Sequence, residues 1–311
     1  MNKVEICRIK SPYRDDMVVN GYLFGKGEES ACIIGSMRGT EIQQTYICSQ
    51  IVKTLKGLEH NGNICANKSV LVIPTVNPYA LNTGRKFWGV EDEDINRAYP
   101  GREFGKTNER IARQIMEYVK NYTFGIQFPS FYADGEFIPH IRMMETGYQN
   151  TSLANLFGLP FVVVRKPQPI DTTTLNYNWQ NEMTAAFSVY SGYNETINEE
   201  KAKQSVSAVL RFLTRMGIIR YDSLSGYISH VIDEDSLTNI YSGSGGFLRK
   251  LKKIGKEVHY GEVVAEIIDP FEGEVKEQIK APTDGIIFFA QREPLTNESD
   301  IVYRIVRRIH E

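Results

Sequence analysis

Residues 73–101 have the sequence IPTVNPYALNTGRKFWGVEDEDINRAYPG, and this stretch decides the fold. It opens inside an apolar, β-rich run over residues 69–76, which an Asn-Pro pair ends because proline lacks a backbone donor. A second apolar run, residues 30–36, precedes it, and residues 41–58 between the two runs carry apolar side chains at helical spacing. Strand, helix and strand in this order form a crossover unit. That unit predicts parallel pairing in a sheet that is covered on both faces.

The same alternation of helices and strands continues to about residue 220. Helical spacing recurs over residues 107–119 and 198–216. Short apolar runs that we expect to be strands occupy residues 123–128, 160–164 and 185–190. We therefore predict an α/β fold with a mixed, mostly parallel sheet flanked by helices, over residues 1–222.

The sequence pattern changes in the last ninety or so residues, where no further helical spacing is found. Short alternating segments such as GEVVAEIID and DGIIFFAQ are separated by glycines, which is typical of compact all-β structure. We predict a separate small β domain over residues 223–311.

Composition excludes several classes of protein. The 311 residues carry a formal net charge of -2, which gives no field to attract nucleic acid or an anionic membrane. No window approaches the roughly 18 uninterrupted apolar residues of a membrane-spanning helix. The four cysteines show no CxxC spacing, which favours buried, reduced thiols. We therefore expect a cytoplasmic protein that has neither nucleic-acid nor membrane partners.

Four short motifs occur in a fixed order along the first hundred residues. They are GSMRGTE at 35–41, IPTVNPYA at 73–80, Arg85, and DINRAYPG at 94–101. This series resembles the succinylglutamate desuccinylase/aspartoacylase family of M14-like zinc carboxypeptidases, whose pattern is roughly GxHGxE, IPxxNPxA, R and DxNRxFPG. The resemblance covers essentially the whole chain and implies a zinc carboxypeptidase-like fold. It also implies that the C-terminal domain is a barrel sandwich like biotinyl and lipoyl domains, without their attachment lysine.

The resemblance assigns a chemical role to several positions. In the family, two histidines and a glutamate hold zinc, whose bound water attacks an amide while a separate glutamate moves the proton. Here Glu41 is retained, but Arg38 and Pro129 replace the histidines and Tyr190 replaces the catalytic glutamate. Neither a guanidinium nor a proline side chain offers zinc a lone pair, whereas Arg38 and Glu41 at i,i+3 can form an ion pair. We therefore predict no catalytic or metal-binding residue and no cofactor.

This sequence matches the substrate-binding positions of the family better than it matches the zinc-binding and catalytic positions. Arg85, Asn96 and Arg97 stand where the family binds a carboxylate, for which a planar guanidinium is well suited. We therefore expect a small carboxylate or peptide-like ligand. The alternative metal site would be formed by His140 with Glu41 and Asp134.

Three functions stay open at this point. The first is a catalytically impaired, pseudoenzyme-like member that binds such a ligand, with a second copy or an active paralogue as its partner. The second is an active zinc-dependent hydrolase of an N-acyl amino acid or peptide amide bond, with a rearranged site. The third is a scaffold or partner subunit that binds no ligand. An ion pair that fixes Arg97 would favour the third.

Overall fold

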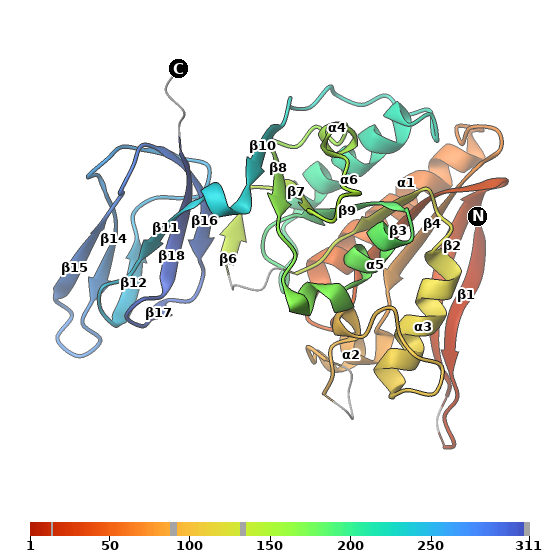
Figure 1. Cartoon of the computed structure of the whole chain (residues 1–311), viewed down its shortest axis with the longest axis horizontal. Helices are drawn as coiled ribbons and strands as arrows, with labels where there is room; N and C mark the ends of the chain where they lie inside the picture. The colour runs from red at the N-terminus through yellow and green to blue at the C-terminus, as the bar shows by residue number, and fades with distance from the viewer. Residues whose placement is uncertain (14, 88–91, 131–134, 308–311) are drawn as a thin grey trace. The chain divides into compact units, whose positions relative to one another are not determined.

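The computed structural model describes residues 1–13, 15–87, 92–130 and 135–307 (Figure 1). Within these ranges the chain forms two compact units. The first comprises residues 1–130 and 139–231, and the second comprises residues 135–138 and 232–307. The predicted combination of an α/β fold with antiparallel β structure at the C-terminus is confirmed.

A mixed sheet of nine strands forms the centre of the first unit in the order β1-β2-β4-β3-β5-β9-β7-β8-β10. Strands β4, β3, β5 and β9 pair in parallel, whereas β1, β2 and β7 join this centre through antiparallel pairs. The strands are β1 (Asn2–Ile9), β2 (Met17–Gly25), β3 (Glu28–Ser36), β4 (Lys68–Thr75), β5 (Phe124–Gln127), β7 (His140–Met144), β8 (Phe161–Arg165), β9 (Ala185–Tyr190) and β10 (His230–Asp233).

Helices cover both faces of this sheet (Figure 1). On one face, α1 (Ile42–His60) and α6 (Glu199–Arg215) contact each other and share a core with Phe187 of β9. On the other face, α3 (Thr107–Val119) and α5 (Leu175–Asn181) pack around the buried Trp179. The shorter helical segments are α2 (Pro78–Thr83), α4 (Thr151–Asn155), η1 (Ile95–Arg97) and η2 (Pro169–Thr173).

The loops that follow the central strands meet at one edge of the sheet because these strands are parallel. The backbone N–H of Val76, after β4, donates to the carbonyl of Ser36 at the end of β3 at 2.9 Å. The N–H of Phe128, after β5, donates to Ile34 at the same distance. Gly39 allows close approach here, because a Cβ on it would lie 2.2 Å from the backbone of Ala80. Residues 37–41, 76–85 and 128–130 are thereby gathered at this edge.

The second unit consists of two antiparallel sheets around a core of its own. One has the order β11-β18-β16-β13, and β16 also pairs with β6; the other has the order β15-β14-β12-β17. The strands are β6 (Gly135–Phe137), β11 (Thr238–Tyr241), β12 (Gly246–Lys250), β13 (Glu257–Val258), β14 (Val263–Ile268), β15 (Val275–Lys280), β16 (Gly285–Gln291), β17 (Leu295–Thr296) and β18 (Ile301–Arg307). Strand β6 thus joins this unit from the middle of the chain, and the predicted boundary at residues 222 and 223 falls in the extended segment before β10.

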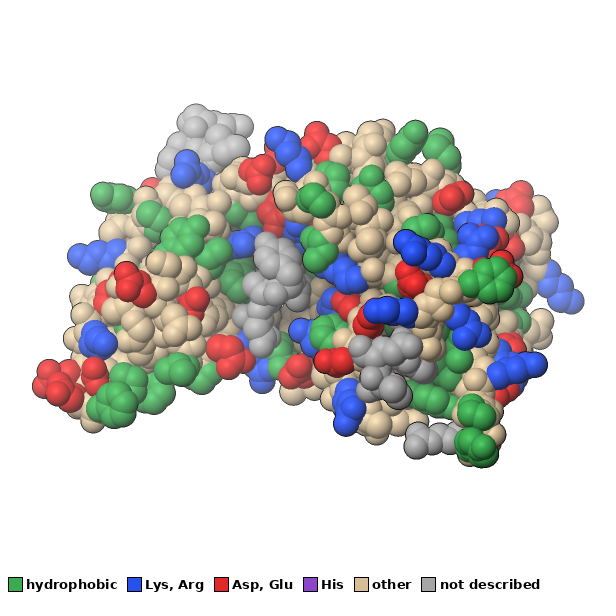
Figure 2. Space-filling view, turned by 60° about the horizontal axis from the view of Figure 1, so that its bottom comes forward, with side chains coloured by type: hydrophobic (Ala, Val, Ile, Leu, Met, Phe, Trp, Pro, Cys, Tyr) green, Lys and Arg blue, Asp and Glu red, His purple; other side chains and the backbone are tan. Residues whose placement is uncertain are grey.

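No helix in the described part of the chain is long and apolar enough to cross a membrane. Figure 2 shows one face of the molecule, on which basic and acidic side chains lie close together. That mixture agrees with the formal net charge of -2.

Candidate functional site

Arg38 lies at the centre of a buried ion network at the carboxyl edge of the sheet. Its Nη2 and Nε donate to Oδ2 of Asp94 at 2.5 and 3.2 Å. Its Nη1 donates to Ser130 Oγ and lies 3.6 Å from Oε1 of Glu41. The exposed fraction of the side chain is 12% for Arg38 and Asp94 and 2% for Glu41. One guanidinium therefore joins two carboxylates and a hydroxyl that come from three separate loops.

Both carboxylate oxygens of Glu41 are engaged within this network. Oε2 accepts the backbone N–H groups of Met37 and Arg38 at 2.7 and 3.0 Å. Oε1 accepts the hydroxyl of Ser130 at 2.5 Å. Burial raises the pKa of Glu41, while Arg38, Ser130 and the two N–H groups act in the opposite direction.

The guanidinium of Arg38 is held in its charged form. Burial acts against this charge, but the neighbouring carboxylates of Asp94 and Glu41 raise the pKa of Arg38 above its ordinary value. Because one cation faces two carboxylates, the network as a whole does not attract anions as a bound metal ion would.

Zinc, the metal that the family resemblance implies, does not fit the residues at this edge. Catalytic zinc sites use three protein ligands with nitrogen, sulfur or oxygen lone pairs. Arg38 offers no lone pair, the buried Pro129 has no donor atom in its side chain, and the oxygens of Glu41 already accept hydrogen bonds. Over residues 1–13, 15–87, 92–130 and 135–307, no group of three or more His, Cys, Asp or Glu side chains could hold a metal ion.

The predicted carboxylate-binding residues lie beside this network. Oδ1 of Asn96 accepts Nε2 of Gln127 at 3.2 Å. Nη1 of Arg97 donates to the carbonyl of Ile170 at 2.9 Å and lies 3.7 Å from Oδ1 of Asp171. The side chain of Arg97 remains 31% exposed, and its Nε and Nη2 have no partner among the residues that the structure describes. Arg97 is thus partly fixed but keeps donors for a ligand.

Arg85 occupies a different setting from Arg97. It follows α2, where its backbone N–H donates to the carbonyl of Ala80 at 3.1 Å, and the residue is exposed. Its own carbonyl lies close to Gly39, one residue from Arg38. The backbone at Arg85 therefore adjoins the loop that carries the ion network.

Tyr190 and His140 pack against each other on the face of the sheet that α5 covers. They are register partners on β9 and β7, and their rings stack with centroids 5.0 Å apart and 4° between their planes. The guanidinium of Arg142 lies 5.7 Å from the centre of the Tyr190 ring. His140 belongs to no metal-binding cluster among the described residues, and Asp134 of the alternative metal site lies outside them.

Two members of the network, Asp94 and Ser130, have no individual signal in the sequence that points to Arg38. Asp94 belongs to the DINRAYPG motif, where its Oδ1 accepts the N–H of Asn96 at 3.0 Å as a helix cap, but the motif does not indicate a contact with Arg38. Ser130 reaches Arg38 only because β5 ends beside β3.

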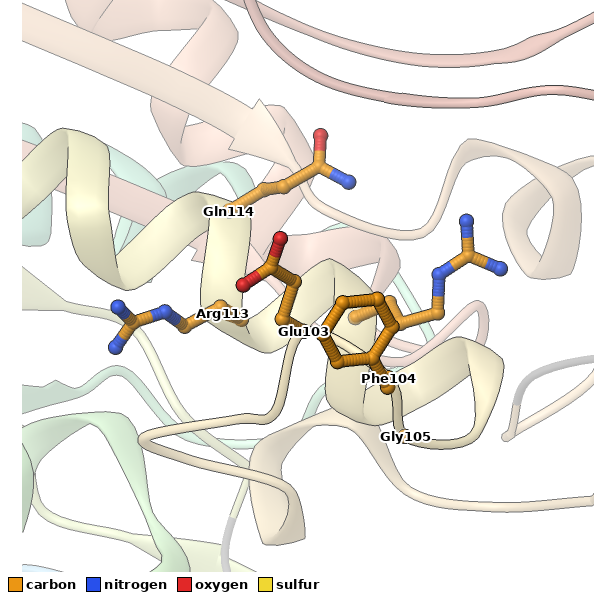
Figure 3. A pocket seen from close by; sticks show the side chains of 6 residues that line it. Glu103, Phe104, Gly105, Arg113 and Gln114 are labelled. Carbon is orange, nitrogen blue, oxygen red and sulfur yellow. The ribbon is translucent and has the colours of Figure 1, made fainter.

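A surface pocket of about 600 Å³ lies in a different part of the first unit (Figure 3). None of the residues that line it belongs to the Arg38 network: they are Glu103, Phe104, Gly105, Arg110, Arg113 and Gln114. In Figure 3 the side chain of Arg113 points away from Phe104, and it pairs with Glu117 at 2.7 Å. This pocket therefore does not form part of the site built around Arg38.

No protein-family model and no curated protein sequence matches the chain. Among solved structures, a succinylglutamate desuccinylase/aspartoacylase from Rhodobacter sphaeroides superposes with a TM-score of 0.77 at 16% identity, over 99% of this chain and 96% of the other. A succinylglutamate desuccinylase from a Silicibacter species gives 0.79 at 16% identity, over 98% and 94%.

A third similar structure is the product-bound ectoine utilization protein EutE from Ruegeria pomeroyi. It gives a TM-score of 0.78 at 15% identity, over 97% of this chain and 94% of the other. These matches extend over both units. The chain therefore has the fold of the succinylglutamate desuccinylase/aspartoacylase proteins.

Proposed function

We propose that this chain is a catalytically impaired protein of the desuccinylase/aspartoacylase fold that binds a small carboxylate or peptide-like ligand. The ion network of Arg38, Glu41, Asp94 and Ser130 carries the proposal. A zinc-dependent amide hydrolase needs a Lewis acid that accepts lone pairs from water and from the scissile carbonyl. A guanidinium donates hydrogen bonds but accepts no lone pair, so Arg38 cannot supply that chemistry.

The position expected for the proton-transferring glutamate supports the same proposal. Tyr190 stands there, 9% exposed and stacked on His140. General base catalysis requires a basic group that reaches the attacking water. A buried ring that contacts both His140 and Arg142 serves packing better than proton transfer.

Arg97 supports the binding part of the proposal. A guanidinium has five N–H donors, and the described partners of Arg97 occupy only Nη1. The remaining edge, Nε and Nη2, suits a carboxylate. The exposed Arg85 is the second candidate for this role.

The test combines turnover with binding of the same compound, N-succinyl-L-glutamate, which the desuccinylases of this fold suggest as a probe. We expect no release of succinate with added zinc, and we expect calorimetry to detect binding of the intact compound. Arg97→Leu should weaken this binding by about tenfold or more, because hydrogen bonds to charged groups contribute about 1.5–3 kcal/mol. Arg102→Leu is the control, since the Arg102 side chain is 80% exposed and its one ion pair within the described part of the chain is with Glu109 at 3.5 Å. Zinc-dependent release of succinate would instead support the active hydrolase.

A scaffold without a ligand is the second candidate, and the contact of Arg97 with Asp171 favours it. Its partner would be a second copy of the chain or an active paralogue. Absence of binding by any N-acyl amino acid would support this candidate. All four cysteines are free thiols, which supports the cytoplasm as the proposed location in either case.

A further inference from the structure

Helix α5 buries an asparagine side chain that has no hydrogen-bond partner. Asn176 is 2% exposed, and neither its Oδ1 nor its Nδ2 is paired within the described ranges of the chain. Leaving a buried polar group unpaired costs about 1–3 kcal/mol. Native proteins keep few such groups, so this one calls for a functional explanation.

Asn176 lies on the same face of α5 as Gln180. Gln180, one turn later on the same face of α5, donates from Nε2 to the carbonyl of Met144 on β7 at 3.1 Å. At the start of the helix, the N–H of Leu175 lies 3.5 Å from Oδ1 of Asn96. Asn176 therefore lies between the predicted carboxylate-binding segment and β7.

The sheet presents polar side chains to this helix. Ile141, Phe187 and Val189 belong to the hydrophobic core on the opposite face, so their neighbours along β7 and β9 point toward α5. Those neighbours are Arg142, Ser188 and the His140–Tyr190 stack described above. Helix α5, which carries the unpaired amide, thus packs on the face of the sheet that bears these polar side chains.

A second asparagine on α5 has a structural role, because its side chain forms hydrogen bonds with the backbone. Asn178 is also buried, at 9% exposure, but its Nδ2 donates to the carbonyls of Thr172 and Thr174 at 2.9 and 2.8 Å. Oε1 of Gln180, by contrast, lacks a partner among the described residues, as Asn176 does. The face of α5 that carries Asn176 and Gln180 therefore offers two unpaired acceptors and one unpaired donor group.

We infer that Asn176 recognises a neighbouring N–H and C=O pair on the ligand, an inference that rests on the proposed function. In an extended N-acyl amino acid or peptide, the N–H and the carbonyl or carboxylate oxygen of one residue lie on the same side. The ligand N–H donates to Oδ1 of Asn176, and the ligand oxygen accepts from Nδ2. Gln180 Oε1 accepts a further N–H from a peptide-like ligand. A simple dicarboxylate has no N–H and leaves both acceptors unpaired.

Two probes that differ in one group test this assignment. N-acetylglycine has the N–H, and 4-oxopentanoate carries CH₂ in its place with the same carbonyl and carboxylate. We expect the wild-type protein to bind N-acetylglycine about tenfold or more tightly, because a site built around a buried acceptor rejects the analogue that lacks the donor. Asn176→Leu should bind the two probes equally in the same calorimetric assay.

Thermal unfolding provides a readout that does not depend on the ligand. We expect Asn176→Leu to match or exceed the wild-type Tm, because it removes an unpaired buried amide at similar volume. Asn178→Leu, the matched control, should lower the Tm because it removes two hydrogen bonds.

Each contrary result overturns a defined part of the account. Equal binding of the two probes by the wild-type protein overturns the inference and leaves the proposed function standing. A loss of Tm in Asn176→Leu as large as that in Asn178→Leu overturns the inference too, because it shows that the Asn176 amide is structural. No binding of N-acetylglycine, of 4-oxopentanoate or of N-succinyl-L-glutamate overturns the proposed function and the inference with it.

Discussion

Replacing Arg38 with methionine tests whether its guanidinium holds the site together. The variant leaves the carboxylates of Glu41 and Asp94 without their cation. Removing one partner of a buried ion pair costs about 3–5 kcal/mol. We expect the lower end, about 3 kcal/mol, because the side chains of Arg38 and Asp94 are 12% exposed. In a unit of this size that loss lowers the Tm by about 6–12 °C.

Urea unfolding followed by tryptophan fluorescence measures this loss in the first unit, because Trp179 is fully buried in its core. Arg38→Met/Asp94→Asn should lose less than the single variant, since it leaves only Glu41 unpaired and asparagine still caps η1. A free energy of unfolding for Arg38→Met within about 0.5 kcal/mol of wild type would refute a structural role for the network.

Three further predictions concern other residues of the first unit and the positions of the family's histidines. Arg38→His/Pro129→His introduces two imidazoles at the loop of Glu41 and the end of β5, and we expect elemental analysis to find stoichiometric zinc in it but not in either single variant. Gly125→Ala places a Cβ 2.6 Å from the ring of Trp179, so urea unfolding should show a loss of about 1–3 kcal/mol. Burial raises the pKa of Cys7 to about 12, and peptide mapping after labelling at neutral pH should find this thiol unmodified in the native protein and modified after unfolding.

A specific result would contradict each of these three predictions. Failure of the double-histidine variant to retain zinc would show that the two positions do not converge on Glu41. Unchanged stability of Gly125→Ala would mean that the Trp179 ring shifts freely, against its full burial. Rapid native labelling of Cys7 would indicate local opening of β1.

The long periodic elements of the first unit could be predicted from the sequence alone. Residues 107–119 and 185–190 coincide with α3 and β9, because amphipathic and apolar patterns of that length depend little on distant contacts. Helix α5 has only seven residues, mostly polar, and offers no such pattern. Strand β6 could not be assigned to the second unit, because its pairing with β16 joins segments far apart in the chain.

The site residues likewise fall into those that a local motif identifies and those that only the fold brings together. Arg38 and Glu41 could be identified because a local motif places them three residues apart. The carboxylate that lies closest to Arg38, that of Asp94, is 56 residues away, and only the fold brings the two together. Asn176 could not be identified at all, since the absence of a hydrogen-bond partner is a property of packing.

The central claim is that a guanidinium takes the place of the metal, and zinc content tests it most directly. Tag-free protein should be measured by elemental analysis before and after incubation with excess zinc and dialysis, with Arg38→His/Pro129→His alongside as the positive control. We predict that the wild-type protein retains far less than stoichiometric zinc while the control retains it. Stoichiometric zinc in the wild-type protein would contradict the account and support a metal-dependent hydrolase with a rearranged site.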